Sequence, residues 1–259
     1  MTELNIKETV ESLINTFLSA GELALSLREK GLQKKIKADN TPVSNGDLEV
    51  NRLLIKRISQ LAPNIPIISE ETSENKSSLN LENFWLVDPI DGTYDYINNL
   101  EEFTINAGLI LKKKPAAGLI YAPAKKRMFY SYGKNSSFEL IDGNQIKLGQ
   151  SGNFNKDEIK FVSYSNNLKP EIKKIHEKLN VKKFVKMKSS LKFCVIAAGE
   201  FDLYVAEPRA SEWDIAAGDA ILSNSGGSIT DMNGEKIYYG KKDFKNPGII
   251  LKSARLNNG

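Results

Sequence analysis

Two aspartates, Asp88 and Asp91, stand three positions apart in the segment WLVDPIDGT at residues 85–93. The three apolar residues before Asp88 predict a short buried strand. Because Pro89 cannot continue a central strand ladder, we expect this strand to end at Asp88. Both carboxylates, and the carbonyl of Ile90 between them, then lie in one turn. Oxygen ligands of this kind favour magnesium, manganese or calcium.

The two residues after Asp91 suit a bound anion. Gly92 lets the backbone approach an anion closely, and Thr93 adds a hydroxyl and an amide. A cation and a phosphate group would therefore meet at this turn. For this motif alone, a turn with two solvated aspartates is an equally good interpretation, because Asp, Pro and Gly are common in turns.

Further acids occur at two other places in the chain. Glu70 and Glu71 follow a predicted strand, and Asp214 opens the helical pattern of residues 213–226. Because the helix dipole favours an acid in the first turn, a role in helix capping remains an alternative for Asp214. The small residues at 216–218 would let this helix approach another backbone closely.

Composition indicates an ordinary soluble protein of one large or two closely packed domains. The chain has 259 residues, of which 41% are hydrophobic and 26% are charged. The net charge of +4 comes from many lysines balanced by nearly as many acids. A solvated lysine-rich surface explains this better than nucleic-acid binding, which we do not expect. A small phosphorylated ligand would benefit from the positive charge.

Histidine and cysteine chemistry is largely excluded. Cys194 is the only cysteine, follows an apolar run and is expected to be buried. His176 is the only histidine, and its amphipathic helical surroundings predict a surface position. Histidine triads and histidine-ligated zinc sites are therefore excluded, so carboxylates, hydroxyls and metals must carry any hydrolysis.

The amino-terminal sequence lacks the pattern of a signal peptide, and no apolar run approaches the ~20 residues of a membrane span. We expect a cytoplasmic protein, with peripheral membrane association left open.

Hydrophobic periodicity divides the chain into two parts. The first part predicts amphipathic helices at 4–29 and 47–61, with a polar connector between them. A strand at 64–69, a polar loop at 69–78 and an antiparallel meander at 103–132 follow. The second alternates strands at 159–165, 182–187, 202–206 and 248–251 with helices at 170–179, 190–199 and 213–226. We expect an α+β domain at 1–145 and an α/β domain at 146–259, with the boundary near 141–157.

Three segments resemble the signatures of the inositol monophosphatase superfamily of magnesium-dependent phosphatases. They are ISEE at 68–71, WLVDPIDGT at 85–93 and WDIAAGDAILSNSGG at 213–227, in the order that the superfamily has them. The resemblance implies a layered αβαβα sandwich of the inositol monophosphatase and fructose-1,6-bisphosphatase type. It also implies metal ligation by Glu70, Asp88, Asp91, Asp214 and the Ile90 carbonyl.

The resemblance further implies two or three Mg²⁺ ions, which Mn²⁺ can replace, and sensitivity to lithium. Asp47, Glu70 and Thr93 are the implied catalytic residues, which position and deprotonate the attacking water. Two metals can lower the pKa of that water and stabilise the leaving oxygen. The oligomeric state is left open between monomer and homodimer.

Within the superfamily, the chain is most similar to bacterial 3'(2'),5'-bisphosphate nucleotidases, which act in sulfur metabolism and convert adenosine 3',5'-bisphosphate to AMP. The similarity lies in KADNTPVSNGD at 37–47, EFTINAGLI at 102–110, GLIYAPAKKRMFY at 118–130 and SSLKFC at 189–194. The implied substrate-binding residues are Glu70, Ile90, Asp91, Gly92, Thr93, Ser189, Ser190, Lys192, Glu207 and Asp214. Lys192 would hold the second phosphate or the nucleotide of a bisphosphorylated substrate, and a solvent-facing helix lysine is the alternative.

Two other functions stay open. An inositol or other sugar monophosphatase would use the same metal site, and a regulatory binding protein would use the same fold. The chain departs from the nucleotidase pattern before Asp214. There Glu207, Arg209 and Glu212 stand where the superfamily contacts the non-reacting part of its ligand.

Overall fold

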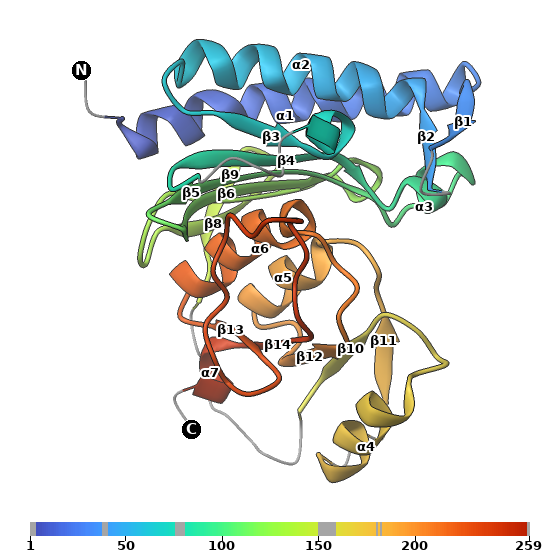
Figure 1. Cartoon of the computed structure of the whole chain (residues 1–259), viewed down its shortest axis with the longest axis vertical. Helices are drawn as coiled ribbons and strands as arrows, with labels where there is room; N and C mark the ends of the chain where they lie inside the picture. The colour runs from blue at the N-terminus through green and yellow to red at the C-terminus, as the bar shows by residue number, and fades with distance from the viewer. Residues whose placement is uncertain are drawn as a thin grey trace.

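The chain folds around two large β-sheets, and the computed structural model describes residues 4–37, 41–75, 81–149, 159–179, 181 and 183–257 (Figure 1). The larger sheet has seven strands in the order β3-β4-β5-β6-β7-β8-β9. β3 and β4 are parallel, and the remaining neighbours are antiparallel. The strands are β3 (Ile67–Ser69), β4 (Phe84–Asp91), β5 (Thr104–Leu111), β6 (Lys114–Ala122), β7 (Arg127–Ser131), β8 (Ser137–Ile141) and β9 (Asn144–Lys147).

The smaller sheet has five strands in the order β11-β10-β12-β14-β13. Its strands are β10 (Phe161–Ser163), β11 (Phe184–Lys186), β12 (Leu203–Ala206), β13 (Ser228–Asp231) and β14 (Ile249–Lys252). β10, β11 and β12 run parallel, whereas β14 is antiparallel to β12 and β13. A separate hairpin joins β1 (Lys34–Ile36) to β2 (Pro42–Ser44).

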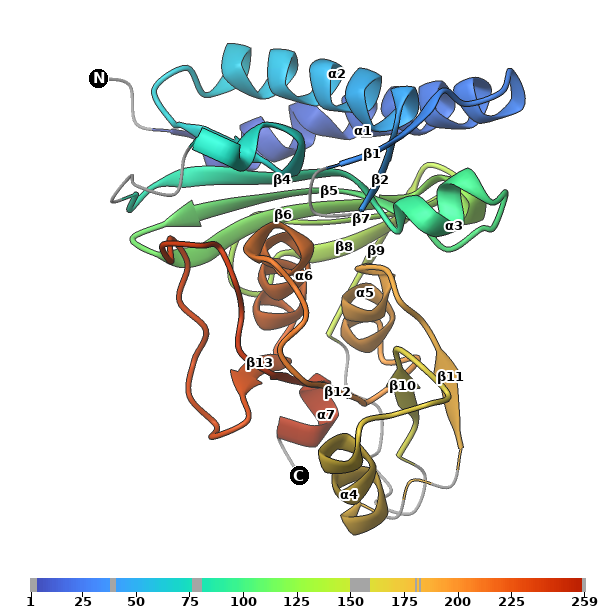
Figure 2. The same cartoon turned by 45° about the vertical axis from the view of Figure 1, so that its right-hand side comes forward.

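Helices separate and cover the sheets, which gives five layers (Figure 1). α1 (Ile6–Glu29) and α2 (Asn45–Leu61) cover one face of the larger sheet. Figure 2 shows α5 (Leu191–Ala197) and α6 (Glu212–Asn224) between the two sheets. α4 (Pro170–Lys178) and α7 (Ala254–Asn257) lie on the outer side of the smaller sheet, and the short α3 (Thr93–Ile97) follows β4. The predicted layered fold is therefore confirmed.

Close packing fixes α6 against the larger sheet. A Cβ atom at Gly108 of β5 would lie 2.7 Å from the amide nitrogen of Ala217, and one at Gly118 of β6 would lie 2.3 Å from the Ala217 carbonyl oxygen. Only glycines on the sheet and small residues on the helix permit this approach. The predicted close approach of α6 to another backbone is confirmed, and it carries Asp214 toward β4.

The structure corrects several local predictions. β4 continues past Pro89 to Asp91, because its pairing with β5 shifts register between Asp88 and Asp91, and such an irregularity accommodates proline. The expected polar loop contains a 3₁₀-helix, η1 (Glu70–Asn75), and the polar connector forms β1 and β2. The sequence also missed β8, β9 and β13, which are short and mostly polar or partly exposed.

The expected division into domains at 145 and 146 stays a prediction. The larger sheet ends with β9, and residues 150–158 of the expected boundary lie outside the described residues. One apolar core contains Phe84 and Ile110 from the larger sheet together with Tyr204 and Leu251 from the smaller one. The two halves are therefore packed as one body.

Within the described residues, every helix is too short or too polar to span a lipid bilayer.

Candidate active site

The carboxyl end of β4 and the turn after it hold their shape through short local hydrogen bonds. The amide of Ile90 donates to Asp88 Oδ1 at 3.1 Å, and the Thr93 hydroxyl lies 3.0 Å from the Ile90 carbonyl oxygen. Gly92 has φ +90°, and a Cβ there would lie 2.8 Å from the carbonyl oxygen of Glu102. A residue with a side chain would therefore strain this turn, which explains the glycine between Asp91 and α3.

Asp47 lies at the start of α2 and contacts the same turn. Its Oδ2 accepts hydrogen bonds from the amide of Ser44 at 2.8 Å and the Ser44 hydroxyl at 2.6 Å, in a capping box. Its Oδ1 lies 3.1 Å from the Thr93 hydroxyl. Burial raises the pKa of Asp47, and the bonds from Ser44 and Thr93 oppose this rise. Sequence analysis missed Ser44, although the spacing of Ser44 and Asp47 is typical of a capping box.

Asp214 lies in the first turn of α6, and Ser190 joins it to the β4 turn. The Ser190 hydroxyl is 2.6 Å from Asp91 Oδ2 and 2.7 Å from the Asp214 carbonyl oxygen, and the Ser190 amide donates to the same Asp91 oxygen at 2.5 Å. Asp214 Oδ2 accepts from the amide of Ser211 at 2.7 Å. The predicted capping role of Asp214 is thus confirmed, but it coexists with a position beside Asp91.

Glu70 and Glu71 begin η1 and share one ammonium group. Lys37 Nζ lies 2.9 Å from Glu70 Oε1 and 2.8 Å from Glu71 Oε1. Burial opposes the charged form of Lys37, but the two glutamates raise its pKa above the usual value. Sequence analysis assigned no role to Lys37, because nothing local links it to acids more than thirty residues away. Residues 38–40 of the same motif lie outside the described residues.

The acids of this region repel one another. Burial, followed by the charges of Glu70 and Asp91, raises the pKa of Asp88 well above its ordinary value. Burial and the charges of Asp91 and Glu70 raise the pKa of Asp214 to about 8. Burial also raises the pKa of Glu70, against the influence of Lys37. A cation bound among these oxygens would remove this repulsion.

In the described part of the chain, no group of three or more His, Cys, Asp or Glu side chains is arranged to hold a metal ion. Lys37 instead supplies the positive charge beside Glu70. Metal binding at these acids therefore stays a prediction.

The turn before α5 lies beside the same acids, because its Ser190 contacts Asp91. The amides of Lys188 and Ser189 both donate to Glu102 Oε1, the latter at 3.2 Å. Lys192 is buried, and its ammonium donates to the carbonyls of Lys188 and Ser189 at 2.9 Å each. The alternative that Lys192 faces solvent is therefore wrong. Glu102 was missed by sequence analysis, because its partners lie more than eighty residues away.

Glu207 follows β12 on the same side of the molecule and is buried. Its Oε1 lies 3.6 Å from Lys169 Nζ. Burial raises the pKa of Glu207, but hydrogen bonding with Tyr164 and the charges of Lys169 and Arg209 bring it below the usual value. Its contact with substrate stays a prediction.

Two other predictions concern residues away from the acids. Cys194 is buried and unpaired, as expected. The surface position predicted for His176 is wrong, because its ring is buried with centroids 5.9 Å from Phe161 and 5.8 Å from Phe184. The helical pattern predicted the right helix but could not reveal which face the smaller sheet covers.

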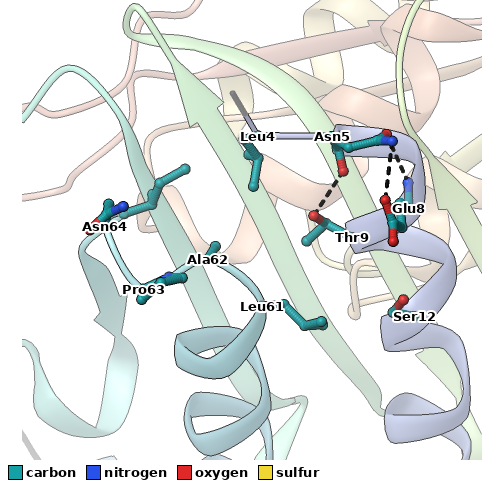
Figure 3. A pocket seen from close by; sticks show the side chains of 10 residues that line it. Leu4, Asn5, Glu8, Thr9, Ser12, Leu61, Ala62, Pro63 and Asn64 are labelled. Atoms are coloured by element: carbon teal, nitrogen blue, oxygen red, sulfur yellow. Dashed lines mark hydrogen bonds between the residues drawn. The ribbon is translucent and has the colours of Figure 1, made fainter. Parts of the chain in front are cut away.

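A cavity of about 450 Å³ lies between the first turns of α1 and the carboxyl end of α2 (Figure 3). Asn5, Glu8 and Thr9 line one side, and Leu61 and Pro63 line the other. None of the predicted site residues lines it, so this cavity is separate from the acids at β4.

Comparison with known proteins identifies the family. Residues 6–258 match the profile of the inositol monophosphatase family. The 3'(2'),5'-bisphosphate nucleotidase CysQ of Buchnera aphidicola is 34% identical over 268 residues, which cover 98% of this chain and 100% of the relative. The protein of the same name from Salmonella typhimurium is 31% identical and covers 93% of this chain and 98% of the relative.

The solved structure of CysQ from Bacteroides thetaiotaomicron, a bacterial member of the same family, superimposes with a TM-score of 0.79 at 27% identity, covering 98% of this chain and 100% of that one. The chain therefore belongs to the inositol monophosphatase family, and the predicted resemblance is confirmed. Its relatives at about 30% identity are named as bisphosphate nucleotidases, so this chain lies in a phosphatase family.

Proposed function

We propose that this chain is a magnesium-dependent 3'(2'),5'-bisphosphate nucleotidase that converts adenosine 3',5'-bisphosphate to AMP and phosphate. The observation that carries the proposal is the crowding of buried acids at the carboxyl end of β4, where Ser190 joins Asp91 to Asp214 and where burial, followed by the charges of the neighbouring acids, raises the pKa of Asp88. The similarity to relatives that are named as 3'(2'),5'-bisphosphate nucleotidases supports the choice of substrate. This assignment includes a place in sulfur metabolism and a cytoplasmic location.

The donor set fits a hard divalent cation. Glu70, Asp88, Asp91, Asp214 and the Ile90 carbonyl offer only oxygen, which suits Mg²⁺ or Mn²⁺ better than softer metals. Bound here in two or three copies, Mg²⁺ would act as a Lewis acid and stabilise negative charge on phosphate. Lys37 pairs with Glu70, so metal binding would require Lys37 either to move away or to share the Glu70 carboxylate with the metal ion.

Asp47 and Thr93 are suited to handle a proton. The Thr93 hydroxyl lies within hydrogen-bonding distance of both Asp47 Oδ1 and the Ile90 carbonyl oxygen. Asp47 is held in place by Ser44, so its Oδ1 is directed at Thr93. In our proposal Thr93 orients the attacking water, and Asp47 and Glu70 accept its proton.

Phosphate would bind where the backbone turns. Gly92 keeps the chain free of side-chain atoms at φ +90°, and the amide groups of Gly92 and Thr93 precede and open α3. Amides at such a turn stabilise anionic oxygens. Ser189, Ser190 and Glu207 would contact the rest of the substrate. Lys192 keeps at most one N–H for it, because two already bond to carbonyls.

The test is a side-by-side assay of phosphate release from adenosine 3',5'-bisphosphate, inositol 1-phosphate and fructose 1,6-bisphosphate, with Mg²⁺ or with EDTA. We expect adenosine 3',5'-bisphosphate to give the highest kcat/KM, and we expect EDTA to abolish turnover. Lithium should inhibit. A preference for inositol 1-phosphate would favour the sugar-phosphatase alternative, and no hydrolysis of any substrate would favour a regulatory binding protein.

A further inference from the structure

Three neighbouring strands of the smaller sheet are parallel, so their carboxyl ends lie on one side of the sheet, which we call the carboxyl edge. β10 pairs with β11 through Phe161 and Phe184, and with β12 through Phe161 and Leu203. The residues directly after these strands therefore gather on one side of the sheet. In open sheets with parallel strands, ligands bind outside such carboxyl ends. The turn after β11 leads to Ser190, which contacts Asp91, so this edge adjoins the acids at β4.

Arg209 and Tyr164 form a stacked pair at this edge. Tyr164 follows β10, and Arg209 lies three residues after β12. The guanidinium carbon of Arg209 is 4.1 Å from the centroid of the Tyr164 ring. Tyr164 is buried, whereas Arg209 is exposed. A rigid aromatic platform thus holds a planar cation at the surface, which lowers the entropy lost when that cation binds a ligand.

The N–H groups of Arg209 are available for a ligand. Among the described residues, no hydrogen bond or ion pair uses them. Glu207 interacts with the charge of Arg209, but its ion pair is with Lys169, at 3.6 Å. A guanidinium presents several donors in a fork that matches phosphate oxygens.

Lys192, unlike Arg209, has few N–H groups left for a ligand. It is buried, and two of its three N–H groups bond to the carbonyls of Lys188 and Ser189. Burial lowers its pKa, the charges of Asp91 and Asp214 oppose that change, and Arg209 adds to it. Lys192 therefore holds the turn that carries Ser190, and the charges of both the acids and Arg209 act on it.

We propose that Arg209, stacked on Tyr164, is a specificity residue that binds the non-reacting phosphate of a bisphosphorylated substrate. This inference rests on the proposed function, because it concerns the substrate end of the same site. The reacting phosphate would lie at Gly92 and Thr93, and the second would lie against Arg209 at the edge of β10 and β12. Arg209 thus takes the main part of the role that the resemblance gave to Lys192.

The test compares two substrates that differ only in the second phosphate, namely adenosine 3',5'-bisphosphate and adenosine 3'-monophosphate. For Arg209→Ala, we expect KM for the bisphosphate to rise about 10- to 100-fold with little change in kcat, since this is the worth of a charge-assisted hydrogen bond. Hydrolysis of the monophosphate should stay within about twofold. Arg209→Lys keeps the charge but loses the forked set of donors, so its KM for the bisphosphate should lie between those of the wild type and Arg209→Ala.

Tyr164→Leu removes the platform and should also weaken only the bisphosphate, provided that circular dichroism shows a folded protein. Arg52→Ala is the matched control, because Arg52 is an exposed arginine on α2 whose guanidinium lies 2.7 Å from Glu49. This variant should hydrolyse both substrates with the kcat and KM of the wild type.

The outcomes separate the inference from the proposed function. If the wild-type protein prefers the bisphosphate nucleotide and Arg209→Ala keeps that preference, the inference is wrong and the function stands. If the protein instead prefers fructose 1,6-bisphosphate over fructose 1-phosphate, which lacks only the second phosphate, and Arg209→Ala erases that preference, the function is wrong and the inference stands. If no second phosphate improves hydrolysis of any substrate, both are overturned.

Discussion

Asp88, near the carboxyl end of β4, and Asp202, directly before β12, are both buried acids, but they differ in what surrounds them. Among the described residues, Asp88 accepts one hydrogen bond, from the amide of Ile90, and its near neighbours in charge are other acids. Asp202 instead accepts from the amide of Lys160, the hydroxyl of Ser253 and the guanidinium of Arg255.

Glu212 resembles Asp202. It is fully buried, and its carboxylate accepts from the amides of Gly240 and Lys241 at 2.8 and 3.0 Å and from Lys241 Nζ at 2.6 Å. These bonds attach the segment around residue 240 to the first turn of α6. The comparison teaches that a buried acid whose donors include a cation serves the fold, whereas buried acids that crowd one another with few donors each indicate a site for a cation.

The largest effect should come from Asp88→Asn. Removal of one crowded carboxylate should lower kcat with Mg²⁺ by about three orders of magnitude or more, because charge stabilisation at the phosphate is lost. Stability should hold or rise, since a like charge disappears from the cluster. Phosphate release and thermal unfolding measure the two effects. Asp142→Asn, in an exposed turn, is the control, and full activity of Asp88→Asn would contradict the distinction.

Arg255→Ala should give the opposite pattern. It leaves Asp202 buried without its guanidinium partner, which typically costs about 3–5 kcal/mol of unfolding free energy. Activity at low temperature should remain, because Asp202 lies away from the β4 turn. Urea unfolding measures the loss, and Arg52→Ala, which breaks an exposed pair with Glu49, should cost about 0.5 kcal/mol or less. Equal losses in the two variants would remove the basis for treating Asp202 as structural.

The pH dependence of stability should also separate the two groups. In the folded chain without metal, burial and neighbouring acids raise the pKa of Asp214 to about 8, from the ordinary value of 3.8. Between these values the folded state binds more protons than the unfolded state, so stability should fall as pH rises from about 4 to 8. The expected loss is on the order of a few kcal/mol.

Thermal unfolding in EDTA across this range measures the slope. Asp214→Asn should flatten it, and Mg²⁺ should reduce it by favouring the charged carboxylates. An unchanged slope in Asp214→Asn would show that Asp214 is not one of the crowded acids.

The sequence predicts the acids of this site better than it predicts their surroundings. Asp88 and Asp91 belong to one turn with a proline and a glycine, and periodicity predicts the helices on which Asp47 and Asp214 lie. Glu102 and Lys37, in contrast, act through partners far along the chain, and only tertiary packing brings these together. The same limit applies to β4, where the pairing with β5 decides how far the strand continues past Pro89.

His176 extends the comparison to a buried base, and the effect should be the smallest of the four. Its Nε2 has no partner among the described residues, and its ring lies between Phe161 and Phe184. Burial lowers its pKa from 6.5, so the unfolded state binds more protons near that value, and stability should fall as pH drops through about 6. His176→Leu should remove this acid sensitivity while changing stability at pH 8 by about 1 kcal/mol or less. Thermal unfolding at pH 5 and pH 8 measures both. If wild type and His176→Leu lose the same stability at pH 5, the ring is hydrated, and burial without a partner does not mark a titrating group in this fold.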